Sequence, residues 1–270
     1  MEFPDMIRLE NVHKTLGGRA ILNGLTLEVK NGETLVILGR SGTGKSVTLR
    51  HIVGLMIPDE GRVEVLGQEI SSHRQASLPK IRSRIGYLFQ DGALLNWLSI
   101  ADNVGLPLRE RNLMPEKEIQ ERVEEVLSEV ELDGHGDKLP SEISGGMRKR
   151  AGLARALVCR PEILLHDEPT SGLDPISSSI INGLIQKLHE TGITQVMVTH
   201  DMSSAFQVAD RIALLHSGKV IALGNADEIQ KSKDPAVQQF IQGLVEGPLG
   251  RETSGEFEPE HPAKEESDLS

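Results

Sequence analysis

The stretch Gly39-Arg40-Ser41-Gly42-Thr43-Gly44-Lys45-Ser46 lies between the apolar run Thr34–Leu38 and a segment with helical apolar spacing, residues 47–53. This order predicts a strand, a phosphate-binding loop and a helix. Glycines let backbone N–H groups converge on an anion, and the start of the following helix adds partial positive charge. Lys45 supplies a mobile charge, and the Ser46 hydroxyl suits a phosphate-bound Mg²⁺. An ordinary glycine-rich turn is the alternative, but the flanking strand and helix favour a nucleotide site.

Size and composition limit the class of protein. With 270 residues the chain can bury a large core, and its single cysteine, Cys159, excludes an internal disulfide or a cysteine-rich metal cluster. No apolar run approaches the roughly 18 residues of a membrane-spanning helix, and the first residues lack a signal-peptide pattern. We therefore expect a cytoplasmic protein that reaches a membrane only through a partner.

The net charge of −11 argues against general nucleic-acid binding, which needs an excess of lysine and arginine. Residues 247–270 hold seven acidic and two basic residues, so this tail carries −5 and the remainder −6. Such a polar, acidic segment is predicted to be disordered when free. Two roles stay open for it, contact with a partner and simple solubilisation.

The spacing of apolar residues predicts an α/β fold. Alternating runs at residues 7–12 and 21–29 predict antiparallel strands, and residues 211–215 and 219–223 predict a hairpin. Strands of a parallel core are expected at residues 34–38, 85–89, 163–165 and 194–198, and helices at residues 115–132, 147–158 and 177–189. One or two short helices are expected in residues 227–244. The expected architecture is a parallel-sheet core of the phosphate-loop NTPase type, an antiparallel β lobe and a helical subdomain at about residues 91–160.

Polar residues at the ends of the predicted core strands are candidates for catalysis. Asp167 can anchor the water shell of Mg²⁺, and Glu168 beside it can orient or deprotonate an attacking water. His200 can touch the γ-phosphate, and Gln90 can sense Mg²⁺ or the attacking water. Taken alone, the acidic pair could be a turn after a buried strand, and His200 and Gln90 could be packed or surface residues.

A second glycine-rich helix start occurs at Ser144-Gly145-Gly146, before Met147-Arg148-Lys149-Arg150. Its N-terminus is a second candidate anion site. With this segment the chain resembles the nucleotide-binding subunit of ABC transporters, since six motifs follow in family order from about residue 7 to residue 223. They are the phosphate loop, Gln90, Ser144-Gly145-Gly146, Asp167-Glu168, Ser171-Gly172-Leu173-Asp174 and His200.

The resemblance implies roles for these residues. Glu168 would be the catalytic base, His200 a γ-phosphate contact and Gln90 a contact to water and Mg²⁺. Residues 39–47, ending in Val47, would hold ATP, and Ser46, Gln90 and water-linked Asp167 would hold Mg²⁺. Ser144, Gly145 and Gly146 would bind the γ-phosphate held by a second copy, which implies a head-to-tail dimer around two ATP molecules. Asp174 would couple the two sites.

Two positions depart from the commonest family pattern. Leu16 lies where many members place an aromatic ring against adenine, so base stacking is expected to be weaker or to come from elsewhere. Met147 replaces the usual glutamine of the signature segment. Together with residues 88–94, 106–110 and 239–248, Met147 is similar to the Mla/Mce branch, whose members energise phospholipid or lipid movement at the Gram-negative envelope.

This branch implies partners and a location. The ATPase would sit on the cytoplasmic face of the inner membrane beneath a permease dimer, with a STAS-domain protein on its helical lobe and an MCE-domain periplasmic protein in the same system. The loop at residues 91–103, with Trp97, Leu94, Leu95, Leu98 and Ile100, would receive the permease's coupling helix. Internal packing of the helical lobe is the alternative for these apolar residues.

Three other functions stay open. A soluble ABC ATPase of DNA repair or translation would carry a long coiled-coil insertion, a zinc hook or a second cassette, and the sequence has none of these. A kinase sharing only the phosphate loop would leave Ser144-Gly145-Gly146 and His200 without a purpose. An amino-acid or metal importer subunit is the nearest rival among transporters.

Overall fold

The computed structural model describes residues 5–71 and 78–250. The chain divides into two compact units, residues 1–232 and 233–270. Most of the predicted acidic tail, residues 251–270, lies outside the described residues. The domain boundary expected at residue 247 and the helical subdomain at about residues 91–160 stay predictions.

An antiparallel sheet of four strands forms one layer of the first unit, in the order β2-β1-β4-β5. Its strands are β1 (Asp5–Leu16), β2 (Arg19–Lys30), β4 (Glu60–Val65) and β5 (Gln68–Glu69). Alternate residues of β1, namely Ile7 and Leu9, are completely buried, as the period of two predicts. The expected antiparallel lobe is therefore confirmed.

A sheet of six strands forms the core, in the order β10-β9-β3-β8-β7-β6. The strands are β3 (Thr34–Leu38), β6 (Ile85–Leu88), β7 (Ile163–Asp167), β8 (Thr194–Thr199), β9 (Arg211–His216) and β10 (Lys219–Gly224). All neighbours pair in parallel except β9 and β10, which form the expected hairpin. Every residue of β3 and β7 is buried, as in strands covered on both faces. The carboxyl ends of β3, β6, β7 and β8 thus meet at one edge, where such sheets bind ligands.

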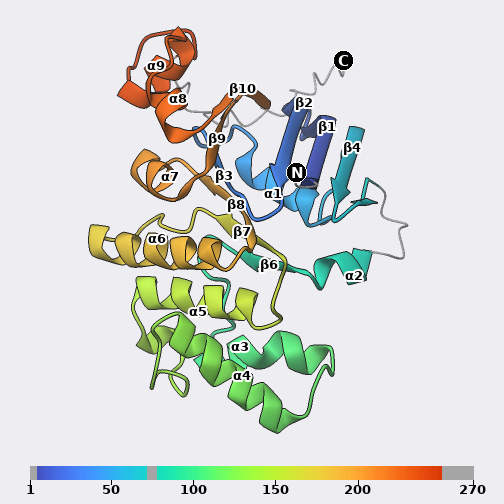
Figure 1. The fold of residues 1–270 in the computed structure, drawn as a ribbon, viewed down its shortest axis with the longest axis vertical. Coiled ribbons are helices and arrows are strands. Elements are labelled where there is room, and N and C mark those ends of the chain that lie inside the picture. Colours follow the sequence, from blue (N-terminus) through green and yellow to red (C-terminus); the bar gives the residue numbers. More distant parts are fainter. Residues whose placement is uncertain (1–4, 72–77, 251–270) are drawn as a thin grey trace, which may run out of the picture. The chain divides into compact units, whose positions relative to one another are not determined.

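Two hydrophobic cores hold this unit together. The first core joins both sheets through α1 (Lys45–Ile52), which contributes the buried Leu49 and Ile52. The second core lies among α3 (Ile100–Glu110), α4 (Glu116–Glu129) and α5 (Gly145–Leu157), and Figure 1 shows these helices gathered together beside α6 (Pro175–Glu190). Leu88 and Leu164 of the parallel sheet also belong to the second core, so they join the helices to the sheet. The described part of this unit also contains α2 (Leu78–Arg82), α7 (Met202–Val208), α8 (Ala226–Gln230) and a 3₁₀ helix at Pro140–Glu142.

The helix α3 corrects the prediction of a continuous loop at residues 91–103, because the chain becomes helical at Ile100. Ser99 caps the helix by accepting a hydrogen bond of 3.0 Å from the backbone N–H of Asp102. Pro107 lies inside α3, and a proline in the sequence normally argues against a helix. The packing of Val104 and Leu108 in the second core outweighs that local preference.

The described part of the second unit is one short helix and the turn that follows it. Asp234 caps α9 (Pro235–Gln242) through the N–H groups of Ala236 and Val237, and Gly243 ends it with φ 64°. The Gln239 side chain is buried, donates to the Leu244 carbonyl and accepts from the Leu249 N–H. The predicted short helices at residues 227–244 are confirmed as α8 and α9.

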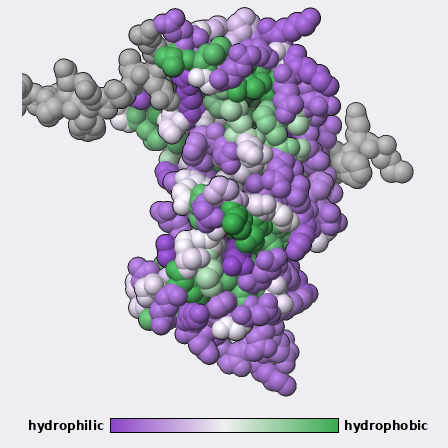
Figure 2. All heavy atoms as spheres, turned by 90° about the vertical axis from the view of Figure 1, so that its left-hand side faces the viewer, coloured by the Kyte–Doolittle hydropathy of each residue, from purple (hydrophilic) through white to green (hydrophobic). Residues whose placement is uncertain are grey.

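Within the described ranges, no helix combines the length and apolar character needed to cross a bilayer. On the face drawn in Figure 2, hydrophobic side chains form separate patches among hydrophilic ones. Such scattered apolar groups are normal for protein surfaces and indicate no particular partner.

Candidate functional site

The loop between β3 and α1 has a backbone that only glycine fits at two of its positions. A Cβ on Gly39 would lie 2.6 Å from the Leu215 carbonyl oxygen. A Cβ on Gly44, whose φ is 105°, would lie 2.8 Å from Cδ2 of Leu22. Gly44 is the N-cap of α1 and has no side chain to satisfy the first N–H groups of the helix. The loop is therefore a cradle of backbone donors suited to phosphate.

Lys45 lies at the bottom of this cradle and is only 6% exposed. Its Nζ donates to the carbonyl oxygens of Gly39 and Arg40 at 2.8 and 3.0 Å. The same Nζ is 3.3 Å from Oε1 of Glu168. The ammonium thus joins the phosphate loop to the predicted catalytic base.

Ser46 and Asp167 come together although 121 residues separate them in the chain. The Ser46 hydroxyl donates to Oδ1 of Asp167 at 2.7 Å, and Tyr87 donates to Oδ2 at 3.1 Å. Burial, and then the Asp167 carboxylate, raise the pKa of the Tyr87 phenol, which keeps it a proton donor. A hydroxyl beside a carboxylate is an oxygen donor set that Mg²⁺ prefers.

Glu168 and His200 form a contact pair at the same edge of the sheet. Nδ1 of His200 is 2.8 Å from Oε2 of Glu168, so the tautomer assigned from this contact carries its proton on Nδ1. The side chain of Glu168 is 11% exposed, whereas that of His200 is 55% exposed. Glu168 also has φ 50°, a left-handed conformation that is costly for a residue other than glycine. The structure therefore holds this carboxylate in a constrained position.

The other predicted residues of the loop contribute backbone and packing. Thr43 donates its hydroxyl to the Arg40 carbonyl at 2.9 Å, and Ser41 is exposed. Val47 packs against the first core, and Gly42 has φ 76°, with nothing within 4 Å of the position that a Cβ would take. Leu16, at the end of β1, is 38% exposed, and its expected place beside the adenine stays a prediction.

Gln90 and the second glycine-rich helix start do not join this group of side chains. Gln90 follows the end of β6 and is exposed, and the hydrogen bonds among Ser46, Asp167, Glu168 and His200 do not involve it. Ser144 caps α5 by accepting from the Met147 N–H at 3.2 Å.

The neighbours of the α5 start are at the start of α6. A Cβ on Gly146 would lie 3.0 Å from the Ser177 hydroxyl, and one on Gly145 would lie 3.7 Å from Leu173. Asp174 caps α6 through the N–H groups of Ile176 and Ser177, and hydrogen bonds from Ser177 lower the pKa of its carboxyl. Ser144, Gly145, Gly146 and Asp174 thus form a second, separate group.

Sequence reasoning missed Lys149, whose Nζ donates to the carbonyl oxygens of Glu168 and Ser171 at 3.0 and 2.6 Å. It is 5% exposed, and burial lowers the pKa of its ammonium. Helical spacing was the available signal, because Lys149 shares a face of α5 with Gly152, Leu153 and Ala156.

A buried polar contact lies behind the acidic pair. His166 is completely buried in β7, and its Nε2 is 2.9 Å from the Gln195 side-chain oxygen. Gln195 in turn donates to the Ile185 carbonyl at 3.0 Å. Burial lowers the pKa of the His166 imidazole to about 4, so the ring is neutral at pH 7.

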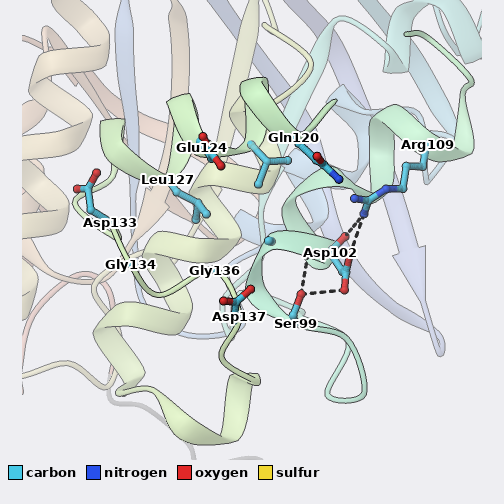
Figure 3. A pocket seen from close by; sticks show the side chains of 12 residues that line it. Ser99, Asp102, Arg109, Gln120, Glu124, Leu127, Asp133, Gly134, Gly136 and Asp137 are labelled. Carbon is cyan, nitrogen blue, oxygen red and sulfur yellow. Dashed lines mark hydrogen bonds and ion pairs between the residues drawn. The ribbon is translucent and has the colours of Figure 1, made fainter. Parts of the chain in front are cut away.

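The helices α3 and α4 and the loop after α4 line a hollow of about 610 Å³ (Figure 3). Asp102 binds Ser99 at 2.8 Å and Arg109 at 3.1 Å on one side of it. Carboxylates also come from α4 and from the loop that follows α4. The acidic residues that line the hollow are Asp102, Glu124, Asp133 and Asp137. One guanidinium among four carboxylates leaves the lining negative.

The residues present fit ATP and Mg²⁺. The glycine cradle and Lys45 would hold the phosphates, and Ser46 and Asp167 would hold the metal ion and its water shell. Glu168 lies 3.3 Å from Lys45 and follows Asp167 directly, so its carboxylate could act as the base for an attacking water. The phosphate loop with Lys45, Ser46, Asp167, Glu168 and His200 forms the first group of site residues. This group can support hydrolysis of a nucleoside triphosphate.

Comparisons with known proteins agree with this chemistry. A protein family described as "ABC transporter" matches residues 22–171. MlaF, the ATP-binding protein of an intermembrane phospholipid transport system in Haemophilus influenzae, is 39% identical over 246 residues, which cover 91% of this chain and 93% of MlaF. The probable ribonucleotide transport ATP-binding protein mkl of Mycobacterium leprae is 41% identical over 245 residues, which cover 90% of this chain and 71% of mkl.

A solved structure is also similar over most of the chain. It is a dimer of the ATP-binding cassette MJ0796 in a post-hydrolysis state, bound to ADP and Pi. The TM-score is 0.76 at 36% identity, with 82% of this chain and 99% of the MJ0796 chain covered.

Proposed function

Because this chain belongs to the ABC transporter family and is an ATPase that uses ATP and Mg²⁺, we propose that it energises phospholipid movement across a Gram-negative cell envelope. The similarity to MlaF, which extends over nine-tenths of both chains, carries the choice of substrate. Met147 and the second unit around Gln239, which resemble the Mla/Mce branch, support the same choice.

In the proposed mechanism, one group of residues acts on ATP within the chain. Bound Mg²⁺ would supply neutralisation of the charge on the phosphates. Lys45 would hold the phosphates, while Oε2 of Glu168 accepts a hydrogen bond from Nδ1–H of His200, which orients the carboxylate. Glu168 would then take a proton from the attacking water.

The second group would act on the ATP of another copy. Ser144 and the first N–H groups of α5 form an anion-binding helix start whose neighbours in its own chain are Leu173 and Ser177. We infer that this start closes on the γ-phosphate held by the partner, in a head-to-tail dimer with Asp174 near the interface. The dimer of the similar cassette MJ0796 supports this arrangement.

The permease would dock on the helical subdomain. Trp97 is 75% exposed, Leu94, Leu95 and Leu98 are half-buried, and Ile100 is completely buried in the second core. Four of the five apolar residues expected at the permease contact are thus partly or largely accessible. The negative hollow begins at Ser99 in the same segment (Figure 3), so we expect the docking segment of the permease to be basic.

This docking site is tested by co-purification of the permease with variants. Trp97→Ala, and Asp133→Asn combined with Asp137→Asn, should each reduce the amount of permease recovered. Glu28→Gln, which removes an exposed carboxylate of the antiparallel sheet, is the matched control and should leave recovery unchanged. Equal recovery with all variants would place the permease elsewhere.

The remaining partners and the location are proposals that follow from the same branch. They are a STAS-domain protein on the helical subdomain, an MCE-domain periplasmic protein, and peripheral attachment to the cytoplasmic face of the inner membrane through the permease. No role in binding nucleic acid is proposed, in keeping with the net charge of −11. Mass spectrometry of the complex purified from membranes would identify these subunits.

Transport itself decides the substrate. The purified complex in liposomes should move fluorescent phospholipid between membranes when ATP and Mg²⁺ are added, and Lys45→Ala should abolish that movement. Uptake of labelled ribonucleotides, the substrate named for mkl, is measured in parallel. ATP-dependent uptake of ribonucleotide, amino acid or metal ion without movement of phospholipid would refute the lipid assignment.

A further inference from the structure

Lys149 connects the two groups of residues within one chain. It is the fifth residue of α5, so its Cα lies about 7.5 Å along the helix from Ser144. Its ammonium donates to the carbonyl of Glu168 at 3.0 Å and to that of Ser171 at 2.6 Å. Glu168 is the proposed base, and Ser171 lies in the turn at residues 169–172 that leads to Asp174.

The hydrogen bond from Lys149 holds the backbone carbonyl of Glu168, whereas the other partners hold its carboxylate. Lys45 and His200 fix the carboxylate, while Lys149 and the Ser171 N–H both donate to the carbonyl of the same residue. Glu168 has φ 50°, and Pro169 follows it. A residue keeps such a costly conformation only where its surroundings hold it from several sides. A change in the tilt of this peptide would move the carboxylate relative to Lys45.

Lys149 has little freedom to act by itself. Its side chain is 5% exposed, and the chain segment after β6 packs closely behind it, since Cα of Lys149 is 3.8 Å from the position of a Cβ on Gly92. Arg155 donates to the carbonyls of Gly92 and Ala93 and fixes that segment to α5. A shift of α5 must therefore carry the Lys149 ammonium with it, and hydrogen bonds weaken steeply with such displacements.

We propose that Lys149 is a positioning residue. Through it, the binding of a phosphate at the α5 start determines the position of the Glu168 carboxylate. Phosphate bound at Ser144 fixes the position of α5, Lys149 then fixes the Glu168 and Ser171 carbonyls, and Glu168 is aligned over the ATP of its own chain. Each nucleotide in the dimer thereby prepares the other site for hydrolysis. This inference rests on the proposed head-to-tail dimer.

The experiment measures ATP hydrolysis by the complex against ATP concentration. Lys149→Met keeps most of the unbranched side chain and removes its charged donor, so kcat should fall about 10-fold to 100-fold, since misalignment by about 1 Å can cost 100-fold. KM for ATP should change less than twofold, and the Hill coefficient should fall to 1. Lys149→Arg can still donate to two carbonyls and should recover at least half of kcat and the cooperativity.

Arg150→Met is the matched control. Arg150 is the next residue of α5 and also donates to two backbone carbonyls, those of Val130 and Glu131, at 3.0 and 2.5 Å. Both methionine variants should lower Tm, because each removes two hydrogen bonds to backbone carbonyls, but Arg150→Met should leave kcat and the Hill coefficient unchanged.

Three outcomes would overturn the proposal: wild-type kcat and cooperativity in Lys149→Met, equal kinetic losses in both methionine variants, or failure of Lys149→Arg to restore kcat. Failure of the proposed function would look different, because the unmodified complex would then lack ATP-dependent transport of phospholipid.

Discussion

The two glycine-rich helix starts of this chain differ in what surrounds them. At α1, a lysine, a hydroxyl and the two carboxylates at the end of β7 come within 3.3 Å of one another or of the cradle. At α5, Ser144 caps its own helix, and the neighbouring groups are Leu173 and Ser177. The first start can bind and activate a phosphate within one chain, whereas the second offers donors without a base or a metal site. In the proposed head-to-tail dimer, two copies would bring both kinds of start to one phosphate.

The largest effect is expected when the proposed base, Glu168, is removed from the site at the α1 start. Glu168→Gln keeps the size of the side chain and can still accept from His200, but it cannot take a proton. Hydrolysis should fall about 10²-fold to 10⁴-fold, the usual contribution of a general base. Because the donors at both helix starts remain, the ATP-bound dimer should accumulate, as measured by light scattering. Hydrolysis at the wild-type rate would show that another group is the base.

The next effect weakens the cradle itself. Lys45→Ala removes a charged donor, and because a hydrogen bond to a charged group is worth roughly 1.5–3 kcal/mol, the affinity for ATP should fall about 10-fold to 100-fold. Titration with a fluorescent ATP analogue measures this loss. Lys14→Ala, which removes a lysine bound to Asp59 in the antiparallel sheet, should leave the affinity unchanged.

A third prediction tests whether the α5 start serves the other copy. Ser144→Asp keeps a capping side chain but places a carboxylate against the phosphate, so hydrolysis should fall about 10-fold or more. A mixed dimer of Lys45→Ala and Ser144→Asp chains has both changes in one site and none in the other. It should retain one ATP, measured as bound nucleotide per dimer.

Retention of no nucleotide by the mixed dimer, with each variant alone also failing to retain it, would place Ser144 in the site of its own chain. Ser144→Thr is the control, because it keeps both the cap and the neutral hydroxyl.

The smallest effect on activity is expected at His166, a buried residue of β7 next to Asp167. His166 has a pKa of about 4 when folded against a reference of 6.5, so the unfolded chain binds a proton more readily. This contribution to stability is complete above pH 6.5 and is lost as the pH falls towards 4. Between pH 7.5 and pH 5 it lowers the free energy of unfolding by about 2 kcal/mol.

His166→Phe should remove that part of the pH dependence, measured by urea unfolding at the two pH values. Because the imidazole is neutral, completely buried and bound to Gln195 rather than to a residue of the phosphate site, hydrolysis at pH 7.5 should change less than twofold. An unchanged pH dependence in the variant would mean that another group causes it.

Much of the fold could be predicted because the signals were local. The strands and helices around the phosphate loop, the antiparallel lobe and the β9–β10 hairpin follow from apolar periodicity and turn residues over a few positions. The loop predicted at residues 91–103 was wrong at its end, because α3 begins at Ile100 and packing in the second core favours a helix there. The roles of the individual site residues and the domain boundaries stay predictions.

By itself, the sequence determined which segment of the chain can form a phosphate cradle and which strand ends in carboxylates. The reason is that glycine, proline and apolar spacing act over neighbouring residues. Only the tertiary structure decided which distant groups meet. Ser46 reaches Asp167 across 121 residues, and Lys149 reaches the carbonyl of Glu168 from another helix. Those meetings depend on the order of the strands in the sheet and on how α5 packs against it, and these are set by the whole core rather than by any one segment.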